Sequence, residues 1–353
     1  MNVSVTNEVI QQHYRHQFGV DSPHIESLNS AGGFSGAEFW RIADFDEHGA
    51  QTLYCLRKWP RSSSIQAESK DESRLNWIHR QLARAHSGGC DFVPVPLPDL
   101  DGQTLVSHGQ HLWQLEPWMP GQASYRSAPS ETRLAAAMQA LARFHQAVRT
   151  SKCRREPSPG ILMRVQRLGE LYDGKSLTAQ FHQIQSAAAD VRQNKEIRDL
   201  GSNICQRFAA LAPSIQKQLN QSASIDVEIQ TIIGDIWHDH VLFTDDQVTG
   251  IVDYGAMRMD TPAADLARLL GSLAGESIDL PIAGLNAYQA ATTNVSWADN
   301  RIIECYDSST TVISGMNWLQ WICVEGRVFG DLQPVVERMK MISRRMDFLT
   351  SCL

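Results

Sequence analysis

The sequence of 353 residues lacks the cysteine patterns that mark secreted or zinc-stapled proteins. Its seven cysteines are scattered and odd in number, and no two of them form a C-x-x-C pair. That pattern disfavours a disulfide framework and a structural zinc site, and it is typical of a protein kept in a reducing compartment. We therefore expect a cytoplasmic location.

Long apolar runs and an excess of positive charge are also missing. Nowhere do 18 apolar residues follow one another, as a membrane-spanning helix would need, and residues 1–20 hold no apolar core of signal-peptide length. The formal net charge of -7 gives no general attraction to nucleic acid or to an anionic membrane surface. Neither is expected as a partner, and no feature indicates an oligomeric state.

The composition is that of an ordinary globular protein, with 42% apolar and 20% charged residues. A chain of this length exceeds the usual size of one hydrophobic core, so two lobes are expected. The sequence has no internal repeat and no low-complexity linker, which predicts that the lobes are joined tightly. Residues 161–222 and 278–353 have the composition and spacing of helices.

The most informative stretch runs from residue 232 to residue 255. An apolar run ends at Asp235, two short β-rich runs follow, and a second acidic residue, Asp253, precedes a glycine. The turn residues 244–247 between the two runs predict a β-hairpin. Such a hairpin would bring Asp235 and Asp253 close together. Two carboxylates so placed suit phosphoryl transfer, in which one orients a hydroxyl and the other holds magnesium.

In this order and spacing, the residues resemble the catalytic and metal loops of the aminoglycoside phosphotransferase and choline kinase-like family. The matching runs are Gly234-Asp235, Val241–Phe243, Ile251–Gly255 and, resembling the family's G-D-P-x-x-D-L-A segment, Asp260–Arg268. Four ordered matches are specific, whereas a lone D-Y-G would be weak. The resemblance implies an α+β, bilobal protein-kinase-like fold, with a small antiparallel-sheet N-lobe and a larger, mainly helical C-lobe. We expect these lobes at residues 1–115 and 116–353.

The resemblance also implies an activity, the transfer of the γ-phosphate of ATP (or GTP), with Mg²⁺, to a hydroxyl of a small molecule. Carried over by motif, Asp235 would be the catalytic base and Asp253 a metal ligand. Asp265, in the last run, is expected to anchor the catalytic loop through hydrogen bonds. Because the family acts on many alcohols, the resemblance does not specify the acceptor.

Residues 28–42 predict a strand, a glycine-rich loop and a returning strand. Such a loop can lay backbone N–H groups on nucleotide phosphates, although an ordinary hairpin turn is the simpler interpretation when the segment is taken alone. It resembles the family's G-G-x-S-N loop, with a glycine in the place of Asn. The resemblance implies nucleotide contacts from Gly32, Gly33, Ser35 and Gly36.

Residues 52–59 are rich in β-branched and aromatic side chains and predict a strand. A cation here should face the nucleotide phosphates and be held by an acidic residue on the following helix. The choline kinase branch carries Arg in an L-R pair, which puts Arg57 first and Lys58 second. Glu72 is the expected partner and Glu68 the fallback. The alternative is that both cations lie on a solvated strand end.

The run 112–121 resembles the hinge that joins the lobes of the family, where backbone groups meet the adenine edge. Glu116 and Trp118 are therefore candidates for nucleotide binding. Next, residues 130–147 predict a helix with Ser130 as its N-cap. His145, near its end, is expected to be a hydrogen-bonded core residue.

Two positions depart from the family's pattern, and both lie in the active loop. Ile233 replaces the His of H-G-D, and His240 replaces an Asn whose amide oxygen binds Mg²⁺. Imidazole is a poorer ligand than oxygen for Mg²⁺ and suits transition metals better. His240 is thus open to three interpretations: a ligand of the nucleotide metal, part of a transition-metal site with His238, or a loop residue.

The departures also leave open an alternative function, a kinase-like protein that binds a nucleotide or metabolite with weak or no phosphotransfer. A hydrolase is disfavoured because the sequence has neither G-x-S-x-G nor H-E-x-x-H, and because a hydrolase would leave the glycine-rich loop unexplained.

Overall fold

The computed structural model describes residues 3–19, 23–28, 37–46, 48–60, 65–150, 153–172, 179, 195–292, 300–327, 329 and 332–352. The chain folds as two compact units. The first comprises Met1–Ala128, Gln146–Val148 and Asp239–Met257, and the second comprises Pro129–His145, Arg149–His238 and Arg258–Leu353. The first unit thus extends past residue 115 and includes the predicted hairpin. The functional division at residues 115–116 stays a prediction.

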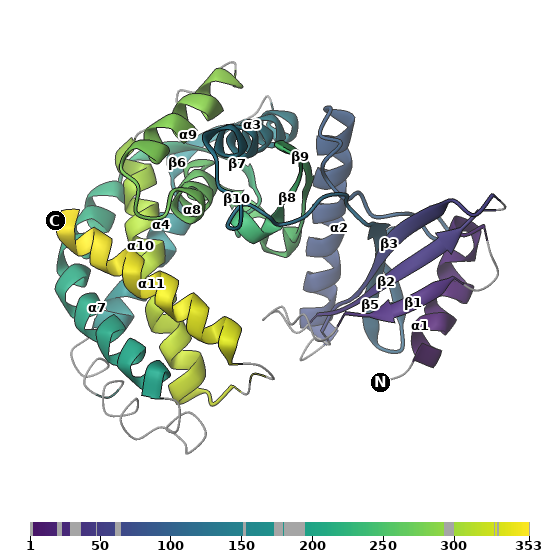
Figure 1. Cartoon of the computed structure of the whole chain (residues 1–353), viewed down its shortest axis with the longest axis horizontal. Helices are drawn as coiled ribbons and strands as arrows, with labels where there is room; N and C mark the ends of the chain where they lie inside the picture. Colours follow the sequence, from purple (N-terminus) through teal and green to yellow (C-terminus); the bar gives the residue numbers. More distant parts are fainter. Residues whose placement is uncertain are drawn as a thin grey trace. The chain divides into compact units, whose positions relative to one another are not determined.

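A five-stranded antiparallel sheet forms the centre of the first unit, in the order β1-β2-β3-β5-β4 (Figure 1). The strands are β1 (His24–Ser27), β2 (Glu38–Phe45), β3 (Gln51–Lys58), β4 (Val106–His108) and β5 (His111–Pro117). The strand predicted at 52–59 is confirmed as β3, and the two strands predicted around the glycine-rich segment pair as β1 and β2. Gly32, Gly33, Ser35 and Gly36 lie outside the described residues.

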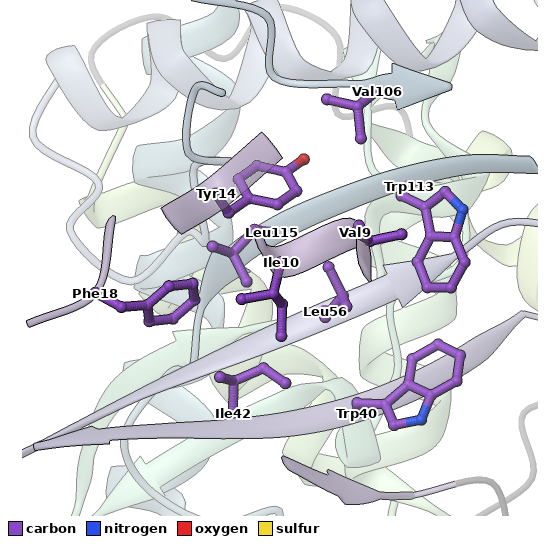
Figure 2. Packing of buried hydrophobic residues seen from close by; sticks show 10 residues of the cluster. All are labelled: Val9, Ile10, Tyr14, Phe18, Trp40, Ile42, Leu56, Val106, Trp113 and Leu115. Carbon is purple, nitrogen blue, oxygen red and sulfur yellow. The ribbon is translucent and has the colours of Figure 1, made fainter. Parts of the chain in front are cut away.

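One face of this sheet carries the hydrophobic core of the first unit, which Figure 2 shows from close by. The helix α1 (Val3–Val9) and the π-helical turn Ile10–Tyr14 supply apolar side chains to this core. The strands contribute Trp40 and Trp113, whose rings stack with centroids 5.4 Å apart. Since side chains alternate along a strand, the residues that follow Trp113 and Leu115 face the other side of the sheet.

The helix expected after β3 is α2 (Ile65–Ser87), which supplies a residue to that other face, where His79 meets the β5 residue Gln114. The hairpin is confirmed as β8 (Val241–Thr244) and β9 (Gln247–Ile251). Its two-residue turn places Asp245 at φ +53°, a conformation that Asp tolerates better than most residues.

The second unit has a three-stranded antiparallel sheet in the order β10-β7-β6, together with most of the described helices (Figure 1). The strands are β6 (Arg154–Pro157), β7 (Asp226–Ile232) and β10 (Arg258–Asp260). The helices are most of α3 (Glu131–Val148), then α4 (Pro159–Tyr172), α7 (Lys195–Ser222), α8 (Ala263–Ala274), α9 (Asp279–Ala290), α10 (Asn300–Leu319) and α11 (Gln333–Cys352).

The predicted helix at 130–147 is confirmed as α3. The Ser130 side chain accepts a hydrogen bond from the backbone N–H of Arg133 at 3.1 Å, as an N-cap should. The helices α7, α10 and α11 pack against one another, and α8 packs against α10. No helix in the described ranges is both long and apolar enough to span a membrane.

A buried carboxylate, Asp260, joins β10 to the helices of the second unit. It accepts hydrogen bonds from Ser158 Oγ at 2.8 Å and from Tyr306 Oη at 2.9 Å. Gly160, in the first turn of α4, lies against this cluster. A Cβ on Gly160 would come within 2.2 Å of Asp260 Oδ2 and 2.4 Å of Tyr306 Oη, so the position requires glycine.

We predict opposite effects for alanine at two glycines of α4. Gly160→Ala should destabilise the protein by about 1–3 kcal/mol, because the methyl group overpacks the Asp260 cluster. Gly169→Ala should stabilise by about 0.5–1 kcal/mol, because Gly169 has open space around it and alanine favours a helix. Midpoints of urea unfolding measure both changes. Equal effects of the two substitutions would show that Gly160 is not sterically constrained.

Candidate functional site

Arg57, on β3, is the central cation of the first unit. Its side chain is 8% exposed and lies between two aromatic rings, with Cζ 4.7 Å from the centroid of Phe39 and 4.9 Å from that of Trp59. Its Nη1 is 3.5 Å from Asp253 Oδ1, and its Nη2 is 3.9 Å from Glu116 Oε1. The buried Nε has no hydrogen-bond partner in the described structure. The guanidinium is therefore held in place but not saturated with hydrogen bonds.

Lys58, the second candidate cation, follows Arg57 and faces the other side of β3. Its Nζ pairs with Glu38 Oε1 at 2.6 Å and lies 5.8 Å from the ring centroid of Trp113. Trp113 belongs to the hydrophobic core, so Lys58 points away from Asp253. The alternation of side chains along β3 thus favours Arg57 for the phosphate role.

Buried polar groups surround Arg57 on the face of the sheet opposite the hydrophobic core. Glu116 accepts a hydrogen bond from Gln114 Nε2 at 2.6 Å, and Gln114 Oε1 accepts one from Trp59 Nε1 at 2.9 Å. Burial raises the pKa of Glu116, while Arg57 and Gln114 oppose that rise. Burial lowers the pKa of His79, which contacts Gln114, to about 4, so this imidazole is neutral at physiological pH.

Asp253 follows β9 and occupies the left-handed region, with φ +64° and ψ +66°. A non-glycine residue in this region costs free energy, and such residues concentrate at functional sites. The conformation places Oδ1 beside Arg57 and Oδ2 3.7 Å from His240 Nε2. The Asp253 side chain is 47% exposed, so a ligand can reach the carboxylate.

Glu72, the expected partner of Arg57, is exposed on α2, and no ion pair within 4 Å joins the two described side chains. Glu116 and Asp253 take that place in this structure. A residue of α2 near Asp253 is Arg74, which donates to the carbonyl of Gly255. Sequence analysis missed Arg74, although it stands two positions after Glu72 in the matched helix.

Backbone groups of the expected hinge are already hydrogen-bonded within the first unit. Trp118 N–H donates to the Leu53 carbonyl at 3.0 Å, and the Leu115 carbonyl accepts from Leu97 N–H at 2.7 Å. Trp118 itself is half-buried, and Arg41 Cζ lies 5.9 Å from its ring centroid. The contact of Glu116 and Trp118 with a nucleotide base stays a prediction.

The loop that carries Asp235 follows β7 in the second unit, and Asp265 holds it. The buried carboxylate accepts hydrogen bonds from the backbone N–H groups of Ile233 and Gly234, each at 2.7 Å. Gly234 has φ +86°, which glycine adopts without strain. The expected anchoring role of Asp265 is confirmed.

A second partner of Asp265 is His145, whose Nε2 lies 3.0 Å from Asp265 Oδ2. The other ring nitrogen, Nδ1, is 2.7 Å from the Tyr288 hydroxyl. Burial and the nearby Asp265 carboxylate raise the pKa of Tyr288, so the phenol keeps its proton. Because a carboxylate only accepts, the Nε2–H tautomer of His145 suits Asp265, and its Nδ1 then accepts a hydrogen bond from the Tyr288 hydroxyl. His145 is a buried core residue, as expected, and it also supports the loop anchor.

Arg268, on α8, binds the side chain of Asp235, which sequence analysis did not foresee. Its Nε and Nη2 both donate to Asp235 Oδ1, at 3.1 and 2.7 Å. The Asp235 side chain is 49% exposed and therefore open to a ligand. The available signal was the helical spacing, because Arg268 follows Asp265 by three residues and so lies one turn further along α8.

The predicted site residues thus fall into two groups. The structure brings Arg57, Glu116, His240 and Asp253 together in the first unit. Asp235 belongs to the second unit. The expectation that Asp235 and Asp253 lie close together joins residues of different units and stays a prediction.

The ligand atoms around Asp253 suit a metal ion that the protein and a nucleotide bind together. Within the described ranges, no group of three or more His, Cys, Asp or Glu residues could hold a metal ion. Mg²⁺ in kinase-type sites is bound by one or two carboxylates, with substrate phosphates and water completing its shell. One reachable carboxylate beside a cation for phosphate fits that mode. The fit of His240 is poorer for Mg²⁺ than for a transition metal.

Comparisons with solved structures support the fold. Spectinomycin phosphotransferase, crystallised with ADP and spectinomycin, is 14% identical, with a TM-score of 0.64 over 100% of this chain and 99% of that chain. An aminoglycoside phosphotransferase from Alicyclobacillus acidocaldarius is 14% identical, with a TM-score of 0.59 over 99% and 96%. Amicoumacin kinase, in complex with AMP-PNP and Ca²⁺, is 13% identical, with a TM-score of 0.56 over 97% and 93%. The expected α+β, protein-kinase-like fold is confirmed.

Sequence comparison reaches the same family by a separate route. Among curated proteins, no sequence matches this chain. The family model described as "Phosphotransferase enzyme family" matches residues 31–298, about three quarters of the chain, and this range includes both groups of site residues. The chain therefore belongs to the phosphotransferase enzyme family.

Proposed function

We propose that the protein transfers the γ-phosphate of ATP or GTP to a hydroxyl group of a small molecule. The observation that carries this proposal is the left-handed conformation of Asp253, which holds a reachable carboxylate between Arg57 and His240. A strained acidic residue beside a buried, unsaturated guanidinium suits the binding of a metal and a polyphosphate. The cysteine pattern supports a cytoplasmic location.

In this proposal, Arg57 binds nucleotide phosphates. Among the described residues its buried Nε has no hydrogen-bond partner, and the rings of Phe39 and Trp59 fix the position of its guanidinium. A phosphate oxygen would accept hydrogen bonds from the guanidinium on the side of Nη1, which lies beside the exposed Asp253, and charge-assisted bonds of this kind are stronger than neutral ones. Asp253 would hold Mg²⁺, which supplies neutralisation of the negative charge on the phosphates. His240 would contribute a nitrogen beside it.

Asp235 would orient the acceptor hydroxyl and take its proton. Asp265 fixes the backbone before Asp235, and Arg268 fixes the carboxylate itself. Catalysis of phosphoryl transfer depends mainly on positioning, so a carboxylate held at both its backbone and its side chain suits this role. Transfer requires that Asp235 and Asp253 act on the same phosphoryl group.

Asp235→Asn should lower kcat by at least about 100-fold, because the amide cannot accept the hydroxyl proton. The rise in melting temperature caused by ATP should remain, since Asp235 is not proposed to bind nucleotide. ATP consumption with Mg²⁺ is measured against amino sugars, choline, ethanolamine, homoserine and nucleosides. Asp245→Asn, which changes a turn carboxylate and keeps a residue that tolerates positive φ, is the matched control. Undiminished turnover in Asp235→Asn would exclude the base role.

Asp253→Asn should abolish the additional thermal stabilisation that Mg²⁺ gives in the presence of ATP, because the charged oxygen ligand is lost. ATP alone should still stabilise the variant through Arg57. Asp246→Asn, in the turn of the same hairpin, is the control and should behave like the unchanged protein. A normal Mg²⁺ increment in Asp253→Asn would place the metal elsewhere.

His240→Asn restores the family's usual residue and should shift the metal preference. We expect the unchanged protein to favour Mn²⁺ over Mg²⁺, and the ratio of kcat/KM with Mn²⁺ to that with Mg²⁺ to fall at least about tenfold in the variant, because an amide oxygen suits Mg²⁺ better than imidazole does. An unchanged ratio would make His240 a loop residue.

The alternative, a nucleotide- or metabolite-binding protein with weak or no phosphotransfer, has a distinct signature. His240 and Ile233 are the observations that favour it. Stabilisation by ATP and metal without turnover of any candidate acceptor would support the alternative against the kinase.

A further inference from the structure

A series of hydrogen bonds runs through the first unit from the loop before β4, by way of helix α2, to the carboxylate beside Arg57. It begins at Thr104, whose Oγ1 lies 2.8 Å from His79 Nδ1 on α2. His79 Nε2 lies 3.1 Å from Gln114 Oε1 on β5, and Gln114 Nε2 donates to Glu116 Oε2 at 2.6 Å. We call these four residues the Thr104–Glu116 network.

The chemistry of the neighbouring groups fixes the direction of each hydrogen bond in this network. The indole of Trp59 can only donate, so the Gln114 atom that accepts from it at 2.9 Å is Oε1, and the amide nitrogen faces Glu116. Because Oε1 only accepts, the Nε2–H tautomer of His79 suits it, and Nδ1 then accepts from the Thr104 hydroxyl. All the donors therefore point toward the Glu116 carboxylate.

Burial keeps the Thr104–Glu116 network in this arrangement. It lowers the pKa of His79 to about 4, so the imidazole is neutral at physiological pH and retains the acceptor nitrogen that Thr104 needs. The cavity beside His79 and Gln114 is also lined by three buried apolar side chains of α2, Leu75, Ile78 and Leu82. In such apolar surroundings, successive hydrogen bonds polarise and strengthen one another.

Glu116 connects the network to Arg57. Its two carboxylate oxygens have different partners, because Oε2 accepts from Gln114 whereas Oε1 lies 3.9 Å from Arg57 Nη2. Burial raises the pKa of Glu116, while Arg57 and Gln114 oppose that rise and so favour the ionised form. At 3.9 Å the contact with Arg57 is an ion pair rather than a hydrogen bond. Glu116 therefore positions the guanidinium through its charge, without occupying its N–H donors.

The network connects α2 to Arg57 at a different point from the one that the family resemblance implies. Glu72 is exposed, whereas His79 is buried and follows it by seven residues, or about two helical turns. The helix thus supports Arg57 from further along its length, and it does so through two residues of β5.

We propose that His79 and Gln114 are positioning residues for the binding of a polyphosphate. Through Glu116, they hold Arg57 in the geometry that meets the phosphates. This inference deepens the proposed phosphotransferase function and rests on it for the identity of the ligand. Arg57 Nη2 faces Glu116, and Nη1 faces the exposed Asp253. The anchored Glu116 fixes one end of the guanidinium while the other end meets phosphate, which lowers the reorganisation that binding requires.

Three variants on α2 test the role of His79. Leucine in His79→Leu cannot donate to Gln114, and glutamine in His79→Gln keeps a side-chain N–H donor. His86→Leu makes the same change at an exposed position of the same helix and is the matched control. Titration calorimetry measures the binding of ATP, GTP, inorganic tripolyphosphate, adenosine and guanosine.

We expect His79→Leu to weaken the binding of tripolyphosphate and of the preferred nucleotide about fivefold or more, because a lost hydrogen bond releases Glu116. Binding of the matching nucleoside should change by less than about twofold, since it lacks the phosphates that Arg57 meets. His79→Gln should regain most of the affinity, and His86→Leu should match the unchanged protein. Equal losses for the nucleotide and its nucleoside, or an unaltered affinity for tripolyphosphate, would overturn the inference.

Selective isotope labelling of arginine nitrogen, read by NMR, reports on Arg57 directly in the protein without nucleotide. The signal of the Arg57 Nε–H is identified by its loss in Arg57→Lys. It should shift in His79→Leu and return toward its normal position in His79→Gln. It should also shift in Gln114→Met, which removes the same hydrogen bond from the strand side. An unchanged Arg57 signal in Gln114→Met would contradict the inference even if His79→Leu failed to fold.

The outcomes separate this inference from the function on which it rests. A KM for the nucleotide that His79→Leu raises, with the KM for the acceptor unchanged, supports both. An Arg57 signal that follows the variants in a protein that binds neither ATP nor GTP counts against the proposed function and leaves the positioning of Arg57 standing. Phosphotransfer with a nucleotide KM that neither His79→Leu nor Gln114→Met alters supports the function and contradicts the inference.

Discussion

The hydrogen bonds that Asp265 accepts from the loop after β7 are the interaction on which the proposed chemistry most depends. The carboxylate is fully buried, and it is satisfied by two backbone N–H groups and by His145. A buried charge is tolerated only when such partners compensate for its desolvation. The positions of the partners are therefore coupled through the carboxylate that they share. These hydrogen bonds fix the backbone of the loop on its buried side, whereas the Asp235 side chain stays exposed.

In the first unit, the site residues are held in place by the five-stranded sheet. Successive side chains of β3 and β5 point to opposite faces of this sheet, so the two faces differ in composition. One side is apolar and packs under α1, whereas the other carries Arg57, Gln114 and Glu116. There Glu116 contacts both Gln114 and Arg57, and Arg57 also pairs with Asp253. A rigid apolar face behind a polar one limits the rearrangement that ligand binding would require.

The sequence predicted these features unevenly, for physical reasons. The hairpin and the helix capped by Ser130 were predictable because periodicity and capping are local properties. The anchor Asp265 was predictable because the resemblance to the family assigns a role to that position. The contacts of Arg57 with Glu116, of Arg268 with Asp235 and of Arg74 with Gly255 were not, because they join residues far apart in the sequence. A motif predicts the type of residue at a site, whereas its partners depend on how side chains pack in three dimensions.

The order of the chain within the first unit has a consequence for how the protein is made. Residues 239–257 complete that unit, yet more than a hundred residues of the second unit precede them in the sequence. During synthesis, the five-stranded sheet leaves the ribosome long before β8, in which Phe243 forms backbone hydrogen bonds with Gln122. The early part must wait, with Arg57 still lacking Asp253, until about half of the second unit has been synthesised. Biosynthesis therefore couples completion of the first unit to synthesis of the second.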